Sequence, residues 1–203
     1  MGFFTMKKLL VILAILAIVL LYYFYPETVI TYPPGETAPS QPVQTNLVNK
    51  KQWTVGKFTI EALAKYDIKA RVLSRNNFSL GKESKLSPFD LALGWGPMSD
   101  QNVIDKLKIT QRDRWYFWRA DKLPIPANQI SLNSANTHII PENQNVEDSF
   151  DNVYKGSLIE MKGYLVKVTA ADGWHWVSSL RRDDTGGGSC ELFWVEDLKV
   201  FDN

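Results

Sequence analysis

The sequence predicts an α+β protein that is mainly β, with one N-terminal helix ahead of a compact domain. Three observations predict this class. An unbroken apolar run occupies residues 9–25, apolar and polar residues alternate through residues 58–72, and a second alternating stretch covers residues 157–169. A long apolar run favours a membrane helix, whereas a period of two favours strands with one buried face. The chain has 203 residues, so about 150 remain for one folded domain.

The apolar run predicts an uncleaved transmembrane anchor over residues 1–25. Lys7 and Lys8 precede the run and no basic residue follows it until Lys50, so the positive-inside rule places the N-terminus in the cytoplasm. A cleaved signal peptide is the alternative, because it shares the basic start and apolar middle. The run ends in Tyr-Tyr-Phe-Tyr-Pro, without the small residues of a cleavage site, which favours the anchor. We therefore expect a signal-anchor protein of the inner membrane with a periplasmic domain.

Residues 26–48 predict a linker between the anchor and the domain, which we place at residues 49–203. The segment contains five prolines together with glycine, serine and several threonines. This composition disfavours helix and core, and it favours an extended spacer. An ordered arm that packs on the domain is the alternative.

The first half of the domain mixes strands and short helices. The alternation through residues 58–72 is interrupted only at Leu63, which predicts two strands or one bent strand. Ser87-Pro88 predicts the start of a short helix, and Ser99-Asp100 predicts the cap of a second helix through about residue 108. The aromatic residues 114–119 predict a further strand.

The last third of the domain is the clearest β region. Residues 157–169 predict a strand with a bulge or bend at Gly163, and Asp172-Gly173 predicts a turn into a strand at residues 174–178. A long loop then precedes a last strand at residues 190–195. A glycine-kinked strand, a hairpin and a long loop fit a small bent sheet or barrel of OB or SH3-like type.

Composition limits the partners and cofactors. The net charge of +1 shows no basic bias toward nucleic acid. The single cysteine rules out an intramolecular disulfide. Two histidines and one cysteine, widely spaced, form no zinc pattern, and no EF-hand loop is present. We therefore expect no metal and no cofactor.

Cys190 is the candidate nucleophile. His138 or His175, together with Asp183 or Asp184, has the side-chain chemistry to complete a catalytic dyad or triad. Alternation gives the competing interpretation, because it places Cys190 on one strand face with two large apolar residues, as a small core residue. The same alternation points His175 away from the tryptophans on either side, and therefore toward solvent if these tryptophans are buried.

The loop before Cys190 is the candidate ligand site. It contains Arg181, Arg182, Asp183 and Asp184 followed by three glycines at residues 186–188. Glycines allow several N–H groups to converge on one anion, which the arginines could clamp. The alternative is a solvated hairpin loop whose opposite charges neutralise each other. Because the loop lacks P-loop spacing, nucleotide binding is not predicted.

The aromatic residues have two interpretations. Seven tryptophans lie between Trp53 and Trp194, and Trp95 and Trp115 are candidate ligand-binding residues. Exposed tryptophans stack on sugars or on partner side chains, whereas buried ones form a tryptophan-rich core. Both interpretations stay open at the level of the sequence.

Three segments carry a resemblance to known proteins: LALGWGPMSD (91–100), SANTHIIP (134–141) and SSLRRDDTGGGSCE (178–191). With these segments the chain resembles a family of small membrane-anchored proteins of Gram-negative bacteria that has no assigned function. The resemblance implies a bacterial envelope setting and no activity. Our first hypothesis is therefore a non-enzymatic module that binds an envelope protein or glycan. The alternatives are a thiol-dependent hydrolase or transferase using Cys190, and an accessory subunit of a membrane complex.

Overall fold

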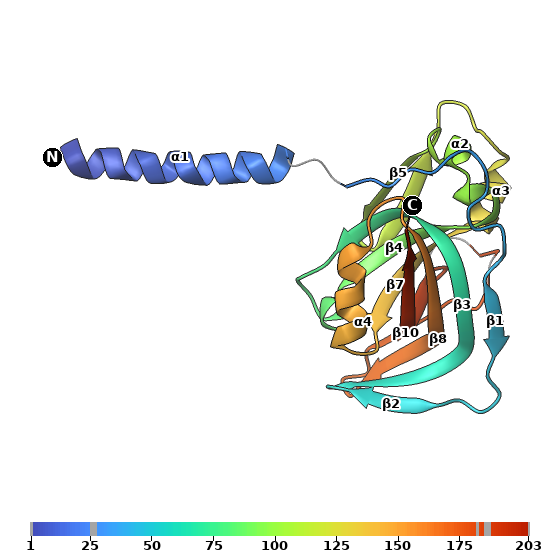
Figure 1. Ribbon diagram of the computed structural model, residues 1–203. Helices are drawn as coiled ribbons and strands as arrows, with labels where there is room; N and C mark the ends of the chain where they lie inside the picture. The colour runs from blue at the N-terminus through green and yellow to red at the C-terminus, as the bar shows by residue number, and fades with distance from the viewer. Residues whose placement is uncertain (1, 25–27, 182, 185–187, 203) are drawn as a thin grey trace.

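The computed structural model describes the chain except for residues 1, 25–27, 182, 185–187 and 203 (Figure 1). The described residues form an N-terminal helix, α1 (Gly2–Phe24), and a mainly β domain with a few short helices. The mainly β class expected from the sequence is therefore confirmed. In the described part of the chain, no helix combines the length and apolar character needed to cross a membrane.

The elements of the domain follow one another closely. Its strands are β1 (Val43–Asn46), β2 (Gln52–Val55), β3 (Phe58–Asn77), β4 (Phe89–Gly94), β5 (Lys108–Arg112), β6 (Trp115–Arg119), β7 (Ser134–Pro141), β8 (Leu158–Ala170), β9 (His175–Val177) and β10 (Glu191–Phe201). Its short helices are α2 (Gln101–Ile104), α3 (Ala127–Leu132) and α4 (Gln144–Ser149), with 3-10 turns η1 (Glu83–Lys85), η2 (Gly96–Ser99) and η3 (Phe150–Asn152).

The long strand β3 is bent rather than broken in two. Its register with β8 shifts at Leu63, and its register with β4 shifts at Leu73. Each shift is a β-bulge, which adds one residue to a strand and bends it. Leu63 is also the residue that interrupts the alternating pattern, so the sequence already marked the position of the first bend.

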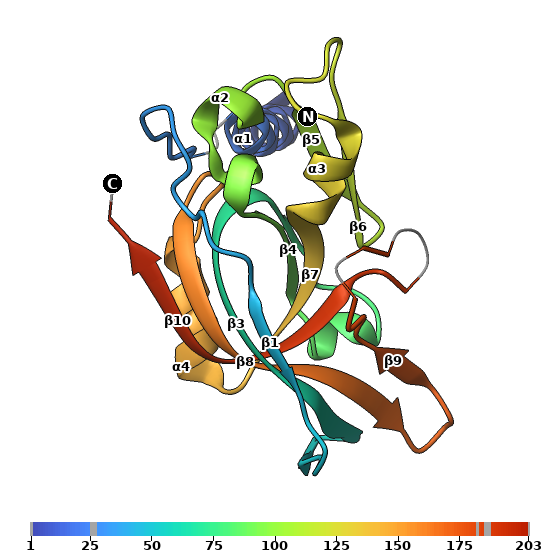
Figure 2. The ribbon, with the colours of Figure 1, turned by 90° about the vertical axis from the view of Figure 1, so that its right-hand side faces the viewer.

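Five strands close into a barrel. β3 pairs with β4, β4 with β7, β7 with β10, β10 with β8, and β8 pairs back to β3. Every pair is antiparallel except β7 with β10, which is parallel. Figure 2 shows these strands curving around one interior. Apolar side chains fill it, among them Tyr66, Leu91, Ile139, Met161 and Phe193.

Gly163 makes the contact between β8 and β10 possible. A Cβ atom at this position would overlap the carbonyl oxygen of Trp194. The register of β10 with β8 shifts directly opposite, between Val195 and Asp197. The irregularity predicted at Gly163 is therefore present as a close backbone approach beside a bulge in the partner strand.

The prediction of a helix beginning at Ser87 is wrong, because strand β4 begins at Phe89. β4 is hydrogen-bonded on both sides, to β3 and to β7, and is buried throughout. These tertiary bonds outweigh the local capping signal. The second predicted helix is present as α2, where the carboxylate of Asp100 accepts a hydrogen bond from Asn102 N at 2.8 Å. It ends early, because β5 starts at Lys108.

The segment between β4 and β7 covers the outside of the barrel. Strands β5 and β6 form a hairpin whose turn residues, Asp113 and Arg114, have positive φ angles of 52° and 61°. Such angles suit a tight hairpin turn but are rare for residues other than glycine. Apolar residues of this segment pack on Leu73 and Ala92 in a separate cluster, which includes Met98 and Ile130.

The described part of the proline-rich segment follows the domain surface as an arm (Figure 1). The amide of Ile30 donates to the carbonyl of Lys155 at 2.9 Å, and the amide of Ala38 donates to Ser99 Oγ at 3.0 Å. Further along, β1 pairs with β3. The arm therefore contacts the domain from residue 29 onward.

Candidate functional site

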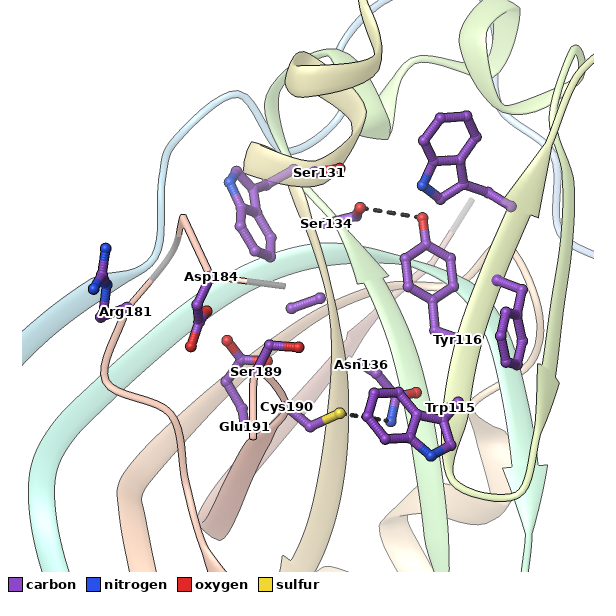
Figure 3. A pocket seen from close by; sticks show the side chains of 14 residues that line it. Trp115, Tyr116, Ser131, Ser134, Asn136, Arg181, Asp184, Ser189, Cys190 and Glu191 are labelled. Atoms are coloured by element: carbon purple, nitrogen blue, oxygen red, sulfur yellow. Dashed lines mark hydrogen bonds between the residues drawn. The ribbon is translucent and has the colours of Figure 1, made fainter. Parts of the chain in front are cut away.

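Two adjoining cavities lie outside the barrel, between the β5–β6 hairpin and the segment that joins β8 to β10. They share two lining residues, Trp115 and Cys190. The tyrosine cavity has a volume of about 310 Å³, and its lining includes Tyr116, Ser134 and Asp184 (Figure 3). The histidine cavity has a volume of about 460 Å³, and its lining includes Arg114, His138, Trp174, His175 and Trp176.

The tyrosine cavity has a polar wall held by a hydrogen-bond chain. Ser134 Oγ donates to the carbonyl of Ile130 at 2.6 Å, so the hydroxyl of Tyr116, 3.1 Å away, donates to Ser134 Oγ (Figure 3). Burial raises the pKa of Tyr116 to about 12. The tyrosine is therefore a neutral, fixed hydroxyl at physiological pH.

Cys190 is half-buried between the two cavities. Asn136 Nδ2 lies 3.7 Å from its Sγ (Figure 3), and burial raises the pKa of the thiol to about 11. Among the described residues, no hydrogen bond joins either histidine to the sulfur. A nucleophilic cysteine needs a lowered pKa and a nearby base. The local environment of Cys190 therefore favours the neutral thiol.

A buried ion pair forms one wall of the histidine cavity. Arg114 Nη1 lies 2.8 Å from Oδ1 of Asp90, whose side chain is 0% exposed, and Arg114 also donates to the carbonyl of Ser87 at 3.0 Å. The guanidinium lies 4.0 Å from the ring of Phe78 and 5.2 Å from that of Trp176. These contacts tie the hairpin turn to β4 and so position the neighbouring Trp115.

His138 lies beside this ion pair. Its Nδ1 is 2.9 Å from Oδ1 of Asp90, but the contact is poorly directed and is not a hydrogen bond. The imidazole packs on the ring of Trp176, with centroids 4.6 Å apart. Among the described residues, Nδ1 of His138 and Oδ2 of Asp90 are buried without a hydrogen-bond partner. A buried, incompletely satisfied polar pair at a cavity wall marks a functional candidate.

The aromatic residues divide between core and cavity. Trp95 is buried, and its Nε1 donates to Gln41 of the arm at 3.0 Å, although the residue also lines the tyrosine cavity. Trp115 is 39% exposed. Trp174 and Trp176 are half-buried and pack on an apolar cluster of residues from β3, β7, β8 and β10, whereas His175 between them is exposed. The predicted solvent-facing side of His175 is therefore confirmed.

The charged loop is partly neutralised within itself. Arg181 forms two hydrogen bonds of 3.0 Å with the carboxylate of Asp183, and both side chains are exposed. Asp184 accepts from Ser179 Oγ at 2.6 Å. These contacts favour the interpretation as a solvated loop over the interpretation as an anion clamp. The candidate Arg182 and most of the glycine run lie outside the described residues.

The fold brings most of the sequence candidates to these two cavities. Trp95, Trp115, Arg181, Asp184 and Cys190 line the tyrosine cavity, and both histidines line the other. Asp183 lines neither. Sequence reasoning missed Asp90 and Arg114 as functional residues, whereas Tyr116 and Asn136 lie in segments that the sequence had singled out, the aromatic residues 114–119 and SANTHIIP (134–141). Asp90 was missed because it fell in the segment wrongly predicted to be helical. Arg114 could have been selected, because an arginine directly before an aromatic run is a sequence feature that indicates a binding surface.

Within the described residues, no group of three or more histidine, cysteine, aspartate or glutamate side chains could hold a metal ion. Comparison of the chain with protein families, with curated proteins and with solved structures finds no match. The proposals below therefore rest on the geometry and chemistry of this chain.

Proposed function

We propose that this chain is a membrane-anchored envelope protein whose periplasmic domain is a non-enzymatic binding module, with a glycan as the preferred ligand class. The proposed anchor is the apolar run of residues 9–25, oriented by Lys7 and Lys8 with the N-terminus in the cytoplasm. A protein ligand is the second possibility for the same site. The observation that carries the proposal is the position of the two cavities on the barrel.

The strand order supports an OB-type barrel. Numbered within the barrel, β3, β4, β7, β8 and β10 are strands one to five, and they close in the order one-two-three-five-four. In OB barrels the ligand face consists of strands two and three with the loops between strands one and two and between strands four and five. Here these are β4, β7 and residues 78–88 and 171–190.

Both cavities draw part of their lining from these elements, and the β5–β6 hairpin supplies much of the rest. Asn136 and His138 come from β7, Glu83 comes from the first loop, and Trp176 and Cys190 come from the second. The two loops are tied by an ion pair of 2.6 Å between Lys82 and Asp172. The site is thus a preformed depression on the face that this barrel type uses for ligands.

The lining chemistry favours a glycan over a nucleic acid. Indole rings at Trp115, Trp174 and Trp176 offer flat apolar faces for sugar rings, while hydroxyl, amide and carboxylate groups beside them can bond sugar hydroxyls. Among the described lining residues, the two arginines are Arg114 and Arg181, and each is paired with an aspartate. These described arginines therefore offer little free positive charge to a phosphate backbone.

A titration of the full chain in a polyoxyethylene detergent with soluble oligosaccharides tests the proposal. The probes are chitotetraose, cellotetraose and a peptidoglycan digest, followed by tryptophan fluorescence. We expect saturable binding that Trp115→Ala weakens about tenfold or more, as loss of one stacking platform does. Tyr154→Ala is the matched control, because this ring is 38% exposed and lines neither cavity. Absence of binding to every probe, or equal loss in both variants, would contradict a glycan site there.

A further inference from the structure

A third cavity lies between the arm and the barrel and shares no lining residue with the other two. Its volume is about 240 Å³. Ile30 of the arm lines one side, and Arg71 of β3, Gln101 of α2 and Lys155 line the others. We call it the arm cavity.

Arg71 is a buried cation for which the described residues provide no carboxylate partner. It is 1% exposed, and no acidic side chain among the described residues lies within ion-pair distance of its guanidinium. Its Nη2 donates to Gln101 Oε1 at 2.9 Å and to the carbonyl of Ile30 at 3.4 Å, and the ring of Tyr32 lies 4.4 Å away. Its Nε and Nη1 have no hydrogen-bond partner in the described part of the chain.

The hydrogen bonds of the Arg71 guanidinium go to neutral groups, and the charge of Asp105 acts on it without forming an ion pair. Burial disfavours a charge unless an opposite charge compensates it, and here burial lowers the pKa of Arg71. Lys155, half-buried on the same cavity, adds a second cation for which the described residues show no ion pair. The one acidic lining residue, Asp105, accepts a 2.7 Å bond from Gln101. Among the described lining residues, the cavity therefore has two cations and one anion.

We propose that the arm cavity binds a phosphate group, with Arg71 and Lys155 as its cationic ligands. An oxyanion would give partners to the unsatisfied Nε or Nη1 of Arg71 and would neutralise the excess charge. The chemistry of the cavity does not depend on the glycan site.

The position of the arm makes a lipid headgroup one possible source of the phosphate group. Residue 24 ends α1 and the amide of Ile30 bonds to Lys155, so five residues lie between them and the two positions are at most about 22 Å apart. If α1 is the membrane anchor, as proposed above, the cavity lies within reach of lipid headgroups. A phospholipid headgroup and free phosphate are the two sources of the same chemistry.

The test uses the full chain in octaethylene glycol dodecyl ether micelles at fixed ionic strength. Inorganic phosphate and dihexanoyl-phosphatidylglycerol are titrated separately by calorimetry. We expect saturable binding of at least one of them, with about tenfold or greater loss in Arg71→Gln and a clear loss in Lys155→Met. Lys122→Met is the matched control, because Lys122 is exposed and lies outside the lining of the cavity.

The two titrations separate the sources. Binding of the lipid without inorganic phosphate assigns the site to a headgroup, and binding of inorganic phosphate with similar affinity assigns it to the free anion. Lys155→Met keeps the test decisive if Arg71→Gln does not fold, because the carbonyl of Lys155, which bonds Ile30, is retained. Absence of saturable binding for both compounds, or a loss in Lys122→Met equal to that in Lys155→Met, would overturn the proposal. Neither result bears on oligosaccharide binding at Trp115.

Discussion

The ion pair between Arg114 and Asp90 gives the sharpest prediction, because it joins the hairpin that carries Trp115 to the barrel. Replacing Arg114→Met leaves the carboxylate of Asp90, which is 0% exposed, without its cation. Removing one partner of a buried pair costs about 3–5 kcal/mol. Against a typical domain stability of about 5–15 kcal/mol, the loss would be readily visible. We expect the free energy of unfolding of Arg114→Met to fall by about 3–5 kcal/mol.

The assay is urea unfolding of the full chain in detergent, followed by near-ultraviolet circular dichroism of the tryptophans. The double variant Asp90→Asn with Arg114→Met removes both charges, so we expect it to recover about 1–3 kcal/mol relative to the single variant. Arg112→Met is the control, because the side chain of Arg112 lies nearby in the hairpin and is 80% exposed. We expect its free energy of unfolding to change by no more than about 0.5 kcal/mol. A loss below about 1 kcal/mol in Arg114→Met, or no recovery in the double variant, would refute the reasoning.

Two further predictions concern the thiol and the closure of the barrel. Because the pKa of Cys190 is raised from 9.0 to about 11, alkylation of the folded chain at pH 8 should be about 100-fold slower than in denaturant. Rapid labelling with an apparent pKa below about 8.5 would instead support the hypothesis of a thiol-dependent hydrolase or transferase using Cys190. The raised pKa also stabilises the fold below pH 9, and this stabilisation should be lost as the pH rises toward 11. Gly163→Ala should lower the free energy of unfolding by about 3 kcal/mol or more, because its Cβ would overlap the carbonyl oxygen of Trp194. Gly173→Ala, whose Cβ meets nothing within 4 Å, should lower it by only about 1 kcal/mol. Equal shifts of the melting temperature in the two variants would contradict this difference.

The strands were the best-predicted part of the fold. Alternation located β3 and β8, because side chains on successive residues of a strand point to opposite faces. The interruption of the pattern at Leu63, which left two strands or one bent strand open, coincides with a register shift in β3. The helix predicted at Ser87 failed because local capping is worth about 1 kcal/mol, whereas β4 gains hydrogen bonds and burial on both sides. The local pattern is reliable where one face is buried, and it fails where an element is buried throughout.

The candidate site was predicted only in its residue types. Cys190, His138, His175 and Trp115 were selected from the sequence, and the fold gathers them at two adjoining cavities. Their protonation and contacts were not predictable. Burial raises the pKa of the Cys190 thiol, although the hydrogen bond from Asn136 lowers it, and both depend on neighbours that are distant in the sequence.

The sequence by itself determined the apolar N-terminal run, the strand periodicity and the turn glycines, because these depend on residues adjacent in the chain. Only the tertiary structure decided that Asp90 meets Arg114, 24 residues away, and that Arg71 lies buried against Ile30, 41 residues away. Such pairs form when closure of the barrel brings distant strands and loops together. Their energies come from burial and charge, which are properties of the packed chain and not of any local segment.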